Sequence, residues 1–97
     1  MHVISQKKLR DFWSLHQDAE FDLRRWYLFA RKATWQSPSA IKAVFSSASF
    51  LGNNRVVFNI AGNKFRLVVK MGYESRRLYV RFLGTHQEYN RIDAETI

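Results

Sequence analysis

The sequence predicts an α+β domain, and three observations lead to that class. Apolar residues recur at helical spacing in the first third of the chain, whereas residues 55–83 alternate with the period of two that is typical of strands. The chain has 97 residues, of which 46% are hydrophobic and 15% aromatic. That is ample for one core and too little for a second domain, so we expect residues 1–97 to form a single domain with helices packed on a small sheet.

The N-terminal part predicts one strand followed by a helical hairpin. Residues 2–5 are short and β-prone, and we expect a first strand there. Residues 6–16, and the stretch after Asp18, which can cap a second helix, each carry an apolar stripe with cations on the other faces. These stripes contain Phe12, Trp13, Phe21, Trp26, Tyr27 and Phe29. Such aromatic stripes are typical of helices that cover a sheet, and they do not indicate a cofactor site.

A short helix and a loop connect the hairpin to the strands. Ser37 is a favourable N-cap residue and Pro38 is favourable at the first helical position, so we expect one or two helical turns from there. Residues 46–54 lose all periodicity and are rich in Ser, Asn and Gly. This composition predicts a loop.

Three alternating runs, residues 55–60, 64–71 and 78–83, predict a C-terminal meander of strands. Each run has one apolar face, and we expect the helices to dock on it. In the last run the alternation assigns Leu78, Val80 and Phe82 to the helix side and Arg81 to the other side. With the N-terminal strand, the sequence predicts a small antiparallel sheet of about four strands.

Charge and composition narrow the classes of function. Sixteen Lys and Arg residues against eight Asp and Glu give a net charge of +8, which favours polyanions such as nucleic acid. The absence of Cys excludes disulfides and thiolate sites, and the three His residues are scattered, so we expect no metal and no cofactor. We find no leader-like or membrane-spanning apolar run and expect a cytoplasmic protein with no membrane partner.

The faces of the strands turned away from the helices carry most of the functional signal. By alternation, one side of the sheet collects Asn59, Lys64, Arg66, Lys70, Tyr79 and Arg81. Like charges directly across a sheet cost about 0.2–1 kcal/mol per pair, so such a face needs an anionic partner or another reason to exist. Because aromatic and guanidinium planes stack on unpaired bases, the pattern favours single-stranded RNA.

Residues 84–93 follow the last strand and hold several reactive side chains together. Thr85 and Glu88 have the spacing of a capping box, which predicts a short helix beginning after Thr85. That helix would set His86 at the mouth of the sheet, and we interpret Glu88 as a cap. By itself, His86 also fits an ordinary exposed histidine, and we interpret His2 and His16 as structural.

The set FNIxGNKxRLVV at 58–69, followed by YxRFxGTHxEYxxID at 79–93, resembles the HigB-type toxins of bacterial toxin-antitoxin systems, relatives of RelE. The resemblance extends to Val3–Ser5, Trp26 and Trp35 and so covers nearly the whole chain. Asn90 departs from it, because such toxins are expected to carry Asp there. The resemblance implies a RelE-like fold and an endoribonuclease that cuts mRNA, generally in the ribosomal A site.

Metal-free cleavage of RNA needs proton transfer and stabilisation of negative charge on phosphorus oxygens. His86 suits proton transfer, Arg66 and Arg81 suit charge stabilisation, and Tyr89 suits base stacking or proton transfer. Which of His86, Tyr89 and Lys64 acts as base or acid stays open. We expect Lys64, Lys70, Asn59, Tyr79 and Arg91 to bind RNA.

The resemblance also implies a protein partner. This would be a HigA-like helix-turn-helix antitoxin, encoded beside the toxin, through which the complex binds operator DNA. Two other interpretations remain open from the residues alone. One is a non-catalytic module that binds RNA or the ribosome through the basic face, and the other is an interaction domain that binds only protein.

Overall fold

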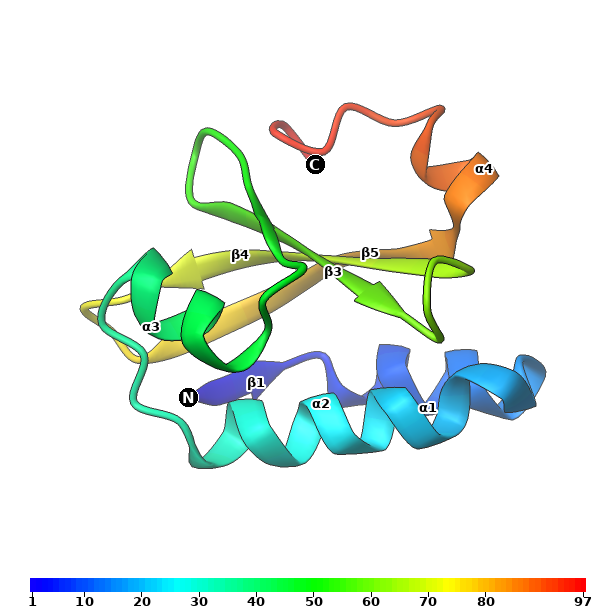
Figure 1. Cartoon of the computed structure of the whole chain (residues 1–97), viewed down its shortest axis with the longest axis horizontal. Coiled ribbons are helices and arrows are strands. Elements are labelled where there is room, and N and C mark those ends of the chain that lie inside the picture. The colour runs from blue at the N-terminus through cyan, green and yellow to red at the C-terminus, as the bar shows by residue number, and fades with distance from the viewer.

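The fold is a five-stranded sheet with helices on one face and the C-terminal segment on the other (Figure 1). The computed structural model describes residues 1–97. The strands are β1 (His2–Ile4), β2 (Ser49–Phe50), β3 (Arg55–Ile60), β4 (Phe65–Gly72) and β5 (Arg77–Thr85). The helices are α1 (Gln6–Leu15), α2 (Glu20–Lys32), α3 (Pro38–Val44) and α4 (His86–Tyr89), with a 3₁₀ turn, η1, at Gln17–Ala19. The α+β prediction is confirmed.

The sheet is mixed and its strands follow the order β1-β5-β4-β3-β2. The meander β3-β4-β5 is antiparallel, but β1 pairs in parallel with β5, with Val3 opposite Leu78. The sheet also has five strands where about four were predicted, because Ser49 and Phe50 pair with Val57 and Val56. Two residues are too few to show alternation, so the sequence pattern of this loop could not reveal β2.

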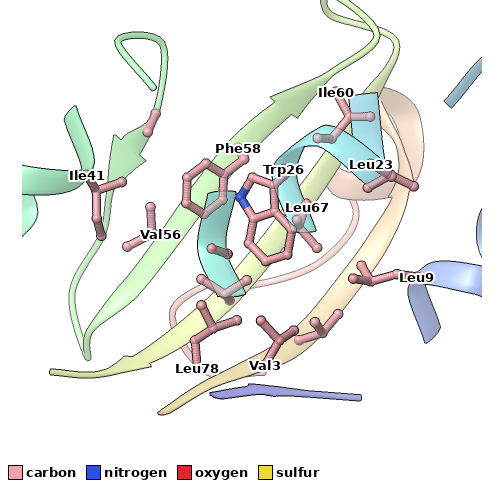
Figure 2. Packing of buried hydrophobic residues seen from close by; sticks show 14 of the residues in the cluster. Val3, Leu9, Leu23, Trp26, Ile41, Val56, Phe58, Ile60, Leu67 and Leu78 are labelled. Carbon is pink, nitrogen blue, oxygen red and sulfur yellow. The ribbon is translucent and has the colours of Figure 1, made fainter. Parts of the chain in front are cut away.

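The core lies between the helices and the meander (Figure 2). Leu9 of α1 and Leu23 and Trp26 of α2 are buried against the apolar faces of the strands. The ring centres of Trp26 and Phe58 are 5.4 Å apart, with the rings meeting edge to face. The predicted helical hairpin over one sheet face is therefore confirmed, and so is α3, whose first turn is capped by Ser37.

A β-bulge in β5 overturns one assignment of faces. Val68 pairs with Phe82 but Val69 pairs with Val80, which leaves Arg81 as an extra residue. One extra residue reverses the alternation beyond it. Phe82 therefore joins the side of Val68, and Leu83 packs on the helix side, opposite to the prediction.

The face of the sheet turned away from the helices, which we call the second face, is partly apolar. Val57 and Val68 are buried there with Ala94, and Phe82, Tyr89 and Ile92 pack against them. Arg55, 7% exposed, donates to the backbone oxygens of Asn53 and Ile97 and so ties the C-terminal segment to this face. Part of the predicted basic face is therefore covered by the apolar C-terminal segment. None of the helices has the length and apolar character needed to cross a membrane.

Candidate functional site

α4 begins with the predicted capping box. Thr85 Oγ1 accepts from the Glu88 backbone N–H at 3.1 Å, and Glu88 Oε1 accepts from the Thr85 N–H at 2.8 Å. The bond from the Thr85 backbone N–H holds the pKa of Glu88 below its ordinary value, because it favours the carboxylate. A Cβ on Gly84 would lie 2.7 Å from the Phe82 ring and 2.9 Å from Glu88 Oε1, so the residue before the N-cap Thr85 has to be small.

The capping box predicts a pH-dependent loss of stability in the variant Glu88→Gln. Because Gln can keep the capping-box bond but not the charge, we expect the variant to lower the free energy of unfolding at pH 7 by about 0.3–1 kcal/mol. Because the folded-state pKa is lowered, the contribution is present above the unfolded pKa near 4.5 and is lost as the pH falls through the folded pKa. Urea unfolding from pH 7 to pH 3 measures it, with Gln87→Ala as the control. A difference that does not change with pH would count against this explanation.

His86 is the first residue of α4 and lies where the helix meets the β3–β4 turn. Its backbone N–H donates to the Lys64 carbonyl at 3.1 Å. Its ring Nδ1 lies 3.2 Å from the side-chain nitrogen of Asn90, one turn further on. The side chain is half-buried, so the imidazole is both held and accessible.

Arg66 projects from β4 onto the second face and reaches Tyr89 of α4. Its Nη2 donates to Asn63 Oδ1 at 2.9 Å, and its guanidinium carbon lies 5.5 Å from the centre of the Tyr89 ring. Asn59 is its neighbour in register, yet Arg66 Nε and Asn59 Oδ1 are buried and make no hydrogen bond within the protein. The guanidinium is therefore held by the Tyr89 ring and by one hydrogen bond, and its Nη1 makes no hydrogen bond within the protein.

His86, Tyr89, Asn90, Asn63 and Arg66 form what we call the α4 cluster. His86 and Tyr89 are three residues apart on the helix and so lie on adjoining parts of its surface. α4 packs against β4 and β5, which brings this surface beside Arg66. The cluster therefore combines an imidazole, a phenol and a partly unsatisfied guanidinium at one end of the sheet.

Lys64 does not lie on the second face. It sits in the β3–β4 turn, and its ammonium lies 2.5 Å from Asp18 Oδ2 in η1, on the helical side. The same contact lowers the pKa of Asp18, because a hydrogen-bonded cation favours the carboxylate. Asp18 therefore pairs with Lys64 and does not cap α2, so both predictions are corrected.

Arg81, Tyr79 and Lys70 form a second group that is separate from the α4 cluster. The Arg81 guanidinium carbon lies 5.5 Å from the centre of the Tyr79 ring, and Tyr79 pairs in register with Lys70. The residue opposite Arg66 on β5 is Gly84, so Arg81 lies three residues away, about 10 Å along the strand. The exposed Arg81 borders a groove against α1, with Lys8 and Leu15.

Arg91 follows α4 and is exposed to solvent. Asn63 and Asn90, which contact Arg66 and His86, were not predicted as site residues. The contact between His86 and Asn90 could have been predicted, because side chains four residues apart on a helix are neighbours. For Asn63 no sequence signal indicated the contact, because it depends on how the turn folds.

His16 lies nearer to this end of the sheet than its sequence position indicates. Its ring stacks on Phe12 with centres 4.3 Å apart and meets the edge of Phe65 at 5.3 Å, and Phe65 pairs in register with Thr85. These aromatic contacts agree with a structural role. No group of three or more His, Cys, Asp or Glu side chains is placed to hold a metal ion.

The fold and the α4 cluster define a class of protein: a small basic α+β domain with groups suited to bind a phosphate and to move a proton beside it. Comparison with known proteins then identifies the family. Residues 19–92 match the family of HigB toxins, described as the RelE-like toxic component of a toxin-antitoxin system. The chain belongs to this family, and the resemblance noted in the sequence is confirmed.

Curated relatives align over nearly the whole chain. The chain is 33% identical over 96 residues to the mRNA interferase toxin HigB of Escherichia coli K12, covering 97% of this chain and 92% of the relative. The same figures hold for the mRNA interferase HigB of Shigella flexneri. A more distant mRNA interferase HigB, from Escherichia coli O6:H1, is 20% identical over 94 residues, which span 95% of this chain and 91% of that protein.

Proposed function

We propose that this protein is an endoribonuclease toxin that cleaves mRNA and thereby inhibits translation. The observation that carries the proposal is the α4 cluster, in which His86 and Arg66 are brought to one end of the sheet by α4 and β4. Membership of a toxin family and the names of the relatives, which are mRNA interferases, support it. Residues 1–97 act together as one toxin domain in this proposal.

The chemistry is a transesterification within the RNA. The 2′-oxygen attacks the adjacent phosphorus, the bond to the 5′-oxygen breaks, and a 2′,3′-cyclic phosphate remains on the upstream fragment. A base takes the proton of the 2′-hydroxyl and an acid gives one to the departing 5′-oxygen, while charge grows on the two non-bridging oxygens. These needs match an imidazole and a guanidinium, and no metal has to take part.

Arg66 is the group that binds the reacting phosphate. The Tyr89 ring and Asn63 fix the orientation of the Arg66 guanidinium, so its free donors are oriented before RNA binds. Preorganised donors cost no reorientation in the transition state, which is why they are effective there. His86 moves a proton beside the same phosphate.

The group of Arg81, Tyr79 and Lys70 binds the flanking nucleotides. It lies about 10 Å from Arg66 along the sheet, a distance that an extended RNA strand spans in about two nucleotides. Tyr79 offers a ring for stacking, and Arg81 and Lys70 neutralise phosphates. Asn59 and Arg91, near the α4 cluster, contribute polar contacts, and Lys64 joins them when RNA displaces Asp18.

The proposed place of action in the cell follows from the proposed substrate, mRNA. Message that is being translated is found on cytoplasmic ribosomes, so we place the protein there and propose cleavage in the ribosomal A site. An antitoxin is implied by the family, and we propose that it carries a helix-turn-helix domain through which the complex binds operator DNA.

The test is cleavage by the purified protein. Incubation with translating ribosomes, and separately with bare mRNA in EDTA, is followed by mapping of new 3′ ends and assay of their cyclic phosphates. We expect new ends that the double variant H86A/R66A does not produce. RNA binding that weakens steeply with salt but leaves the RNA intact would indicate a binding module, and indifference to RNA at every salt concentration would indicate a protein-only domain.

A further inference from the structure

The His86 ring has one hydrogen-bond contact within the protein, and Asn90 provides it. Asn90 closes α4, and its backbone N–H donates to the His86 carbonyl at 3.1 Å. Its side-chain nitrogen lies 3.2 Å from His86 Nδ1. Backbone and side chain of the same residue therefore return to His86, which fixes the ring relative to the helix axis.

This contact decides which ring nitrogen faces outward. Because Nδ1 is held by Asn90, Nε2 is the nitrogen left to meet a substrate. An amide presents an N–H on one side and a carbonyl oxygen on the other, so by rotating it can donate to a neutral ring or accept from a protonated one. Asn90 is thus able to hold His86 both before and after a proton moves.

The electrostatic consequence depends on Asn90 being neutral. The strands β4 and β5, which pack against α4, carry the cations Arg66, Lys70, Arg77 and Arg81, and Lys64 lies in the turn before β4. His16 lies near enough to act on Glu88, and the C-terminal segment itself carries Glu88, Arg91, Asp93 and Glu95. Lys64 is paired with Asp18 and Glu88 is engaged in the capping box. A carboxylate at position 90 would bring a negative charge against the ring, whereas the amide holds the ring without one.

We propose that Asn90 is a positioning residue for His86, which directs Nε2 toward the RNA and keeps a charge-free partner on Nδ1 through the proton transfer. The inference rests on the proposed ribonuclease function.

The test compares three variants with the wild-type protein. Asn90→Asp should raise the pKa of His86 by about one unit, because an opposite charge in contact favours the imidazolium. The matched control Gln87→Asp places the same charge on an exposed neighbouring position of α4 and should shift it by less than half as much. Asn90→Ala should reduce kcat by about 10-fold with KM unchanged, because the ring loses its orientation.

Two readouts separate this inference from the proposed function. NMR titration of the His86 ring in the RNA-free protein tests the contact whether or not the protein is a nuclease. The pH profile of kcat for cleavage tests its role in the reaction, and the limb that His86 controls should move to higher pH in Asn90→Asp. Near-UV circular dichroism checks that each variant keeps its packing.

Each result is decisive. An unchanged His86 titration in Asn90→Asp, or an equal shift in Gln87→Asp, overturns the inference. A shifted titration with an unmoved pH profile overturns the positioning role and removes His86 from the proposed mechanism as well. A protein that cleaves no RNA refutes the proposed function, while the NMR arm still reports on the contact.

Discussion

His86→Ala is expected to slow mRNA cleavage by about 10²- to 10⁴-fold, the usual contribution of a positioned proton-transfer group. We expect a loss of this size because His86 is held in place: α4 and the Lys64 carbonyl fix its backbone. Asn90 fixes the His86 ring. Cleavage rates under single-turnover conditions, in which binding and chemistry are separated, measure the effect. His2→Ala is the matched control, since His2 is exposed on β1.

The same variant should relieve growth arrest when the protein is expressed without an antitoxin. We expect His86→Ala to be tolerated at expression levels at which the wild type and His2→Ala stop growth. A variant as toxic as the wild type would move the proton-transfer role to another side chain, with Tyr89 the next candidate because of its position on α4.

Local features of the fold could be predicted because their determinants lie close together in the chain. The capping box joins Thr85 to Glu88, and the α3 cap joins Ser37 to Ala40, each over three residues. The helical hairpin also follows from repeated apolar residues within each helix. In these cases the partners are fixed by helix geometry, so spacing is sufficient information.

The features that were missed depend on contacts between distant segments. Nothing in the alternation of residues 78–83 marks Arg81 as the bulge, because the bulge exists only relative to the register of β4. The parallel pairing of β1 with β5 likewise depends on how the helices return the chain to the sheet. Sequence periodicity reports which residues share a face only while a strand is regular, and it does not report which strand lies beside it.

The same limit applies to the candidate site. Alternation groups Lys64 with Arg66, yet the Lys64 ammonium pairs with Asp18, 46 residues earlier in the chain. Arg66 and Arg81 are both cations of neighbouring strands, but the register places Gly84 opposite Arg66. Charge and motif therefore indicated candidate residues for an RNA-binding surface, while their division into two groups required the three-dimensional structure.

Because Arg66 and Arg81 lie in separate groups, we expect a large loss of cleavage rate from replacing Arg66. Arg66→Ala should lower the cleavage rate by about 10²- to 10³-fold, comparable to removing a preorganised oxyanion donor. Arg66→Lys should recover little of this, because an ammonium has neither the planar donors nor the stacking on Tyr89. The measurement is kcat under saturating RNA, which isolates the transition state from binding.

Arg81→Ala is the matched comparison, since it removes the same side chain from the neighbouring strand. Arg81 lies over Tyr79 and away from the α4 cluster, so we expect kcat to change by less than about 3-fold. Its loss should instead weaken binding and reduce the slope of log affinity against log salt by about one, as one phosphate contact predicts. Equal losses of kcat in the two variants would show that the RNA draws Arg81 to the scissile phosphate, and would contradict the division into two groups. A loss confined to Arg66 would place the chemistry at the end of the sheet where α4 begins.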